Sequence, residues 1–185
     1  MRSMKKFAAV LAAAAVPLTA CAATLGGYQY ATQYDYQEFY IATAGKPFQV
    51  IVAGNPFPTL NADDVARHLL PAMQASKPRP PLTFTYEKPG EEPHPYYRLV
   101  LVFDPANDFG ASSACNGPPR FKPGTPGRVY VFAVYCRNDL ALSQITGWTE
   151  ASGPDDPRVR DLFKDVFNVL FAYYGQYHDR DKRRR

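Results

Sequence analysis

Two stretches of the 185-residue sequence are apolar at both alternating sets of positions, a pattern typical of strands inside a sheet. The first is Tyr96–Phe103, which is interrupted only by Arg98. The second is Val129–Cys136, and the residues Arg137-Asn138-Asp139 lead from it into a third stretch at 140–149. Asn and Asp tolerate the backbone conformations of tight turns, so the second and third stretches predict a β-hairpin.

Three further strands are predicted around this centre. Apolar and polar residues alternate over 47–53 and over 82–87, as expected for strands with one face toward solvent. Tyrosine, phenylalanine and isoleucine make 34–41 a candidate first strand.

Two helices complete the predicted elements. The first covers 62–74, where Asn61 is a suitable N-cap and Pro71 is expected to kink or shorten the helix. The second begins at Asp156-Pro157, an N-cap followed by proline at the first helical position, and is expected to end near Gly175. Its apolar residues recur at spacings of three and four, which predicts packing of one helix face on the sheet.

The predicted order is β-β-α-β-β-β-β-α, with most strands joined by turns. This order predicts an α+β fold with a mostly antiparallel sheet of five to six strands and both helices on one face. We expect one globular domain over 38–177, which is large enough to bury a core without a metal ion.

The N-terminal 20 residues have the composition of a secretion signal. Arg2, Lys5 and Lys6 precede an apolar stretch at 7–18, which is too short to cross a bilayer. The sequence therefore predicts that residues 1–20 are removed on export.

The signal ends with Leu18-Thr19-Ala20-Cys21. A branched apolar residue, two small residues and a cysteine in this order resemble the lipobox of bacterial lipoproteins. The resemblance implies that Cys21 becomes the N-terminus and carries a diacylglycerol thioether and an N-acyl chain such as palmitate, a membrane anchor that is effectively permanent. It also implies the periplasmic face of a bacterial membrane, and the non-acidic Ala22 favours the outer membrane. A freely secreted protein and an uncleaved signal anchor are the alternatives.

The positive charge of the chain comes from its two ends. Removing 1–20, which holds three basic and no acidic residues, lowers the net charge from +4 to +1. The segment 178–185 is basic and is expected to be a disordered tail, with contact to anionic lipid as the alternative. A basic tail on a mildly acidic body is not typical of nucleic-acid-binding proteins, so no nucleic acid partner is expected.

With Cys21 assigned to the lipid, Cys115 and Cys136 remain as an even pair. In an oxidising compartment such a pair predicts one disulfide. Two free buried cysteines are the alternative.

The segment 21–37 is expected to be a flexible leader that carries the anchor. Its tyrosines are suited to stacking on a sugar or peptidoglycan partner, although they also suit a segment that lies on the domain or joins its sheet. An exposed tryptophan would likewise mark a binding surface. The residues of this possible partner surface are Tyr28, Tyr30, Tyr34, Tyr36 and Trp148.

No recognisable catalytic, cofactor or metal motif is present in the sequence. Asp104, Asp139 and Glu150 are acidic residues at predicted strand ends, and their separation cannot be obtained from the sequence. The three histidines lack a second ligand at the spacing that zinc sites require.

These observations favour a non-enzymatic, lipid-anchored envelope domain that binds or supports an envelope protein or glycan. One alternative is an envelope enzyme of unrecognised type that uses the loop 104–128. The other is a structural lipoprotein whose basic tail contacts the membrane.

Overall fold

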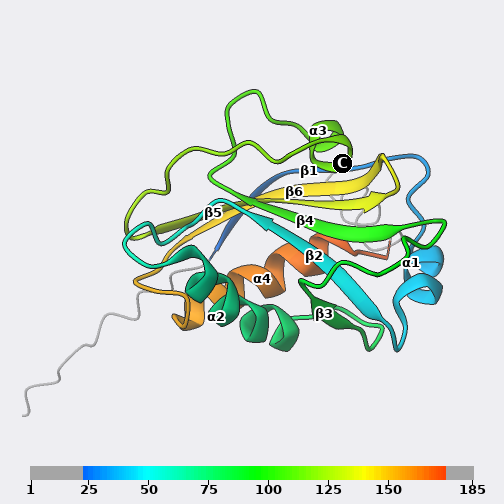
Figure 1. The fold of residues 1–185 in the computed structure, drawn as a ribbon, viewed down its shortest axis with the longest axis horizontal. Coiled ribbons are helices and arrows are strands. Elements are labelled where there is room, and N and C mark those ends of the chain that lie inside the picture. The colour runs from blue at the N-terminus through cyan, green and yellow to red at the C-terminus, as the bar shows by residue number, and fades with distance from the viewer. Residues whose placement is uncertain (1–22, 174–185) are drawn as a thin grey trace, which may run out of the picture.

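The computed structural model describes residues 23–173, which form a six-stranded sheet with helices on both of its faces (Figure 1). The signal segment, Cys21 and the basic tail lie outside the described residues. The elements in chain order are β1 (Thr24–Tyr30), α1 (Tyr36–Thr43), β2 (Pro47–Ala53), α2 (Ala62–Ala75), β3 (Thr83–Thr85), β4 (Tyr97–Phe103), α3 (Ala111–Asn116), β5 (Arg128–Arg137), β6 (Leu140–Glu150) and α4 (Pro157–Leu170).

The strand order is β1-β6-β5-β4-β2-β3. The pairs β1–β6, β6–β5 and β5–β4 are antiparallel, whereas β2 is parallel to both β4 and β3. The sheet is therefore mixed, with antiparallel pairs in the majority, and the predicted α+β class is confirmed. The two parallel pairs require crossover connections, and α2 provides the one between β2 and β3.

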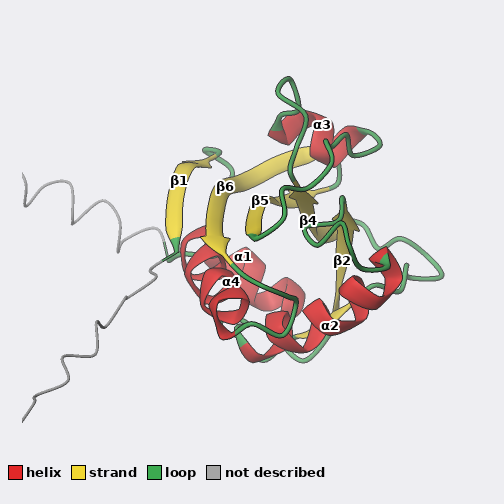
Figure 2. Cartoon of the chain, turned by 90° about the vertical axis from the view of Figure 1, so that its left-hand side faces the viewer, coloured by secondary structure: helices red, strands yellow, loops and turns green. Residues whose placement is uncertain are grey.

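The larger core lies between the sheet and the helices α1, α2 and α4 (Figure 2). Alternate residues of β4 and β5, such as Leu101 and Ala133, point into this core and are fully buried. Helix α4 approaches β6 closely at Gly147, where an added Cβ would lie 2.9 Å from side-chain atoms of both Leu162 and Val166. Glycine at this position therefore sets the distance between helix and sheet.

A smaller core lies on the opposite face of the sheet, under α3. Val100, Val102 and Phe132 point to this side and belong to the same apolar cluster as the helix residue Cys115. The two predicted helices, α2 and α4, do pack on one face, but the predicted number was too low, because α1 joins them there and α3 covers the other face. Six residues inside a loop rich in glycine and proline carry too weak a periodicity to predict a helix.

The predicted strand at 34–41 is in fact helix α1. Asp35 caps it, since its carboxylate accepts a hydrogen bond from the Gln37 backbone N–H at 2.7 Å. Phe39 is fully buried and stacks on Phe171 with ring centroids 4.4 Å apart. Tertiary packing and the cap therefore override the local preference of these residues for a strand.

The expected leader contributes an edge strand of the sheet. Strand β1 pairs with β6, with Thr24 opposite Trp148 and Tyr30 opposite Ser143. Residues 24–37 thus belong to the folded domain, in agreement with the alternative that the tyrosine-rich segment joins the sheet.

The two predicted helices are both present, with small differences at their ends. Pro71 lies inside helix α2, which continues past it to Ala75, so the proline does not end the helix. Helix α4 begins after the N-cap Asp156, as predicted, but ends at Leu170 rather than near Gly175. Among the helices of residues 23–173, none combines the length and apolar character needed to cross a bilayer.

Candidate functional site: a polar pocket around Arg98

Arg98 is the one charged residue in the central strand β4, and only 9% of it is exposed. Its side chain lies on the α3 side of the sheet, because it alternates with Tyr97 and Leu99 of the larger core. One guanidinium nitrogen donates to the backbone oxygen of Asn138 at 2.9 Å, and the other donates to the backbone oxygen of Cys115. The guanidinium also lies 4.9 Å from the ring centroid of Tyr96. Arg98 therefore connects strand β4 with helix α3 and with the turn between β5 and β6.

The hairpin turn between β5 and β6 is held in place by a second set of hydrogen bonds. Asn138 adopts a positive φ of 49°, which asparagine tolerates better than most residues. Its side-chain oxygen accepts from the Tyr96 N–H at 2.8 Å, and its own N–H donates to the Tyr96 oxygen at 2.7 Å. The side-chain amide of Asn116 donates to the backbone oxygen of Asp139 at 2.9 Å.

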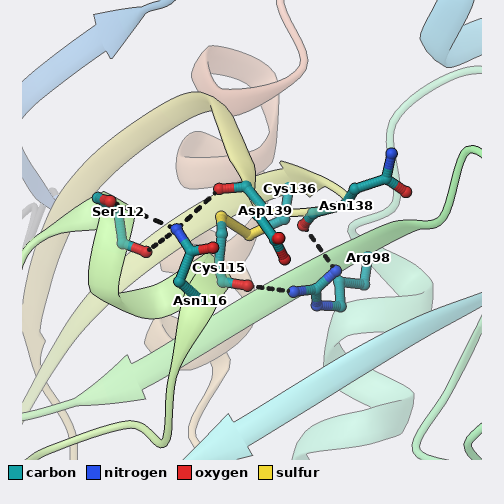
Figure 3. Close-up of a disulfide and its surroundings, with 7 residues drawn as sticks. All are labelled: Arg98, Ser112, Cys115, Asn116, Cys136, Asn138 and Asp139. Atoms are coloured by element: carbon teal, nitrogen blue, oxygen red, sulfur yellow. Dashed lines mark hydrogen bonds between the residues drawn. A yellow bond between two sulfur atoms is a disulfide. The ribbon is translucent and has the colours of Figure 1, made fainter.

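The predicted pair Cys115 and Cys136 forms a disulfide next to Arg98 (Figure 3). It joins α3 to the end of β5, with the two Cα atoms 5.7 Å apart. The disulfide, the Arg98 guanidinium and the Asn116 amide together fix α3 against the hairpin turn.

A polar pocket of about 520 Å³ opens beside this arrangement. Its floor comes from β2 and β4, and its walls come from the segment 88–96 and the hairpin turn. The lining residues are Gln49, Ile51, Lys88, Glu92, His94, Tyr96, Arg98, Asn138 and Asp139.

Two of the charged side chains in the pocket pair with each other, whereas Arg98 has no carboxylate partner among the described residues. Lys88 and Glu92 form an ion pair at 3.0 Å on the exposed rim, and this pair lowers the pKa of Glu92 and raises that of Lys88. Arg98 forms no ion pair with any carboxylate of the described residues, and its partners are two carbonyls and a ring. The side-chain oxygen Oε1 of Gln49 is buried and has no hydrogen-bond partner within residues 23–173. The pocket thus offers a buried cation and an unused acceptor.

A second hollow of about 640 Å³ lies on the other side of the segment 93–95, next to α1. His94 lines both hollows. Near the second one, the Glu38 carboxylate accepts from Arg137 at 2.8 and 2.9 Å and from the Tyr97 hydroxyl. Burial and the hydrogen bond to Glu38 raise the pKa of Tyr97 to about 12. These groups satisfy one another and tie α1 to the sheet.

The five aromatic residues of the expected partner surface lie in different places. Tyr34 donates to the Ala172 oxygen at 2.8 Å, and Tyr30 donates to the Val169 oxygen, so both are bound to the C-terminal end of α4. Tyr36 donates to the Arg79 oxygen at 3.1 Å, and Tyr28 is exposed. Trp148 projects from β6 on the opposite face of the sheet from the larger core, in register with Tyr130.

The three acidic residues at strand ends do not form one site. Asp139 lines the pocket at the start of β6, whereas Glu150 is the last residue of that strand. Strand β6 has eleven residues, so its two ends, and with them Asp139 and Glu150, are roughly 30 Å apart. Asp104 lies near the Glu150 end, since its N–H donates to the Tyr130 oxygen at 3.0 Å, and burial raises its pKa. An enzyme built on these three carboxylates therefore receives no support from their positions.

The sequence contained one signal for this pocket, namely Arg98 as the charged exception in an otherwise apolar strand. The partners of Arg98 come from segments far along the chain, so the pattern alone did not indicate a site. Within residues 23–173, no group of three or more His, Cys, Asp and Glu side chains gathers to hold a metal ion.

No family model and no curated protein matches the chain. Among solved structures, the chain is similar to a PelC dodecamer from Paraburkholderia phytofirmans, with a TM-score of 0.43 and 14% sequence identity, over 81% of this chain and 98% of that one. A single-substitution variant of the same PelC matches over the same shares of both chains with a TM-score of 0.41 and 14% identity.

Proposed function

We propose that this chain is a non-enzymatic binding domain of the bacterial envelope, held at the membrane by a lipid on Cys21, whose Arg98 pocket binds an acidic peptide segment of an envelope protein. The observation that carries the proposal is the buried Arg98 guanidinium without an acidic partner. Removing a cation from water is costly, and two carbonyls compensate for it less well than a carboxylate does. A carboxylate from a partner would complete the pocket.

The other pocket groups favour a peptide over a simple anion. Each bonded nitrogen of Arg98 carries a second N–H, so donors remain for a carboxylate of the ligand. The buried oxygen of Gln49 on the pocket floor needs a donor, and Asp139 of the hairpin turn adds a second acceptor. A peptide segment supplies both a carboxylate and N–H donors, and the open rim at His94 gives it a way in.

The proposal is tested by photo-crosslinking in intact cells. A photoreactive amino acid at His94, on the pocket rim, should capture a defined envelope protein, whereas one at Arg160, an exposed position of α4, should not. Gln49→Met is the informative variant, because the Gln49 oxygen has no partner to lose and the fold should be retained. Capture should fall with Gln49→Met, which removes the acceptor for the ligand. It should also fall with Arg98→Lys, since lysine keeps the charge but cannot form the bidentate hydrogen bonds of a guanidinium.

The proposed binding role would be wrong if capture at His94 equalled that at Arg160, or if neither variant lowered it. Capture of glycan alone would contradict the peptide assignment. The anchor is tested separately: Cys21→Ala should abolish acylation, measured by mass, and release the protein from the membrane fraction. Unchanged mass and fractionation would refute the anchor without affecting the pocket.

A further inference from the structure

The corner of the sheet at the start of β1 carries an exposed aromatic and cationic cluster. Trp148, the only tryptophan of the chain, is 36% exposed, whereas a lone tryptophan is usually buried. The Arg128 guanidinium lies 5.2 Å from the Trp148 ring centroid and 5.4 Å from that of Tyr130. Tyr130 and Trp148 face each other across β5 and β6, so the three side chains form one continuous cluster.

The position of this cluster is fixed relative to the start of β1. Thr24 is the register partner of Trp148, so the first residue of the sheet lies directly beside the exposed ring. Only three Cα–Cα links separate Thr24 from Cys21, which limits the distance between their Cα atoms to about 11 Å. Paired strands add about 5 Å, so a lipid on Cys21 would hold the Trp148 backbone within about 16 Å of the anchored residue.

We infer that the cluster of Trp148, Tyr130 and Arg128 rests on the phospholipid surface and orients the domain there. This inference depends on the proposed lipidation of Cys21. Tryptophan and tyrosine favour the boundary between headgroups and acyl chains, because the ring is apolar and its edge carries a polar group. Arginine beside them buries its stem against the rings and places its charge at lipid phosphate level.

The local charge makes the inference more specific. Glu150 is the register partner of Arg128 and is exposed, so the corner is close to neutral. Contact should then depend on the rings rather than on net positive charge, and it should occur on zwitterionic as well as anionic lipid. This behaviour differs from that of a polybasic segment, which needs anionic lipid.

The single tryptophan allows a direct test. The mature lipidated protein is reconstituted into phosphatidylcholine vesicles whose acyl chains carry bromine, a collisional quencher. Compared with unlabelled vesicles, Trp148 emission should shift to shorter wavelength and be quenched, with and without added phosphatidylglycerol. The matched control combines Trp148→Phe with Tyr40→Trp, which moves the reporter to an exposed position on α1, at the other end of the sheet (Figure 1).

Emission of Trp148 no more quenched than that of the Tyr40→Trp control would overturn the inference. Shielding of Trp148 from acrylamide in native envelopes, without quenching by brominated lipid, would assign the surface to a protein partner instead and would also overturn it. Mass and vesicle flotation of the same sample report lipidation independently, so failure of the anchor is distinguished from failure of the contact. If Cys21 is not acylated, coupling its thiol to a maleimide lipid restores the tether for the same measurement.

Discussion

Two buried tyrosine hydroxyls lie in similar aromatic surroundings but differ in their hydrogen bonding. The Tyr34 hydroxyl donates to the Ala172 oxygen at 2.8 Å, whereas the Tyr135 hydroxyl has no partner among the described residues. The two rings pack edge to face with centroids 6.4 Å apart, and burial raises the pKa of both hydroxyls. An unpartnered buried hydroxyl costs free energy that a phenylalanine would not.

We therefore expect Tyr135→Phe to raise the free energy of unfolding by about 1 kcal/mol, because it removes a polar group without breaking a hydrogen bond. Tyr34→Phe is the matched control and should lower the same quantity by about 1 kcal/mol, because it leaves the Ala172 carbonyl without its donor. Urea unfolding of both variants checks this. Equal loss of stability in the two variants would contradict the assignment of Tyr135 as unpartnered.

At the scale of elements, the start of α4 depends on a single carboxylate. Asp156 Oδ1 accepts from the Arg158 backbone N–H at 3.0 Å, and Oδ2 accepts from the Ser152 N–H at 3.1 Å and pairs with the Arg158 guanidinium at 2.7 Å. Hydrogen bonding to the Arg158 side chain holds the pKa of Asp156 well below its ordinary value. A group with a lowered folded-state pKa stabilises the protein above its unfolded pKa, about 3.9, and loses this contribution as pH falls.

Asp156→Ala should accordingly lower the unfolding free energy at pH 7 by about 1 kcal/mol, the usual loss for a removed N-cap. The difference from the unsubstituted protein should shrink below about pH 4, where the unfolded-state carboxyl becomes protonated. Asp156→Asn keeps a cap acceptor without a titrating charge, so its stability relative to Asp156→Ala should vary little with pH. Urea unfolding at pH 7 and pH 3 provides the comparison, and a pH-independent effect of Asp156→Ala would refute the ionic contribution.

Helix α3 is too short to be stable alone and is held by the disulfide and by Arg98. Replacing Cys115 and Cys136 by alanine should cost about 3 kcal/mol, because the unfolded chain regains the freedom of the closed loop. Hydrogen exchange should rise within 104–128 and remain unchanged in α2. Uniform exchange throughout the chain would instead indicate global destabilisation.

At the scale of the whole molecule, the two proposed contacts lie at opposite ends of β6. Asp139 of the pocket precedes the first residue of the strand, and Trp148 is near its last. Trp148 is eight residue steps along the extended chain from Leu140, which corresponds to roughly 25 Å. A domain resting on its Trp148 corner would therefore present the Arg98 pocket away from the membrane surface.

The parts of the fold that could be predicted are those in which local pattern and tertiary contacts agree. The central strands and α4 combine apolar periodicity with clear ends, and both are present. Helix α1 could not be identified from periodicity, because its residues favour a strand and its packing against Phe171 comes from the far end of the chain. The pattern Asp35-x-x-Glu38, an N-cap followed by an acid at the third position, was the available signal.

The candidate site was less predictable than the fold. Arg98 stood out in the sequence, but its pocket requires the segment 88–96, α3 and the hairpin turn, which no local pattern brings together. Trp148 was a candidate surface residue, but the sequence could not decide its exposure, since a lone tryptophan is usually buried and only the register with Thr24 places it at the sheet corner.

The disulfide has a further consequence for the life cycle of a chain exported as proposed. Before export, in a reducing cytoplasm, Cys115 and Cys136 remain thiols, and the carbonyl that Arg98 uses is not covalently fixed to the sheet. The pocket then reaches its final form only after translocation and oxidation. If the proposed binding role and export hold, the pocket would therefore become competent for its ligand only once the protein has matured.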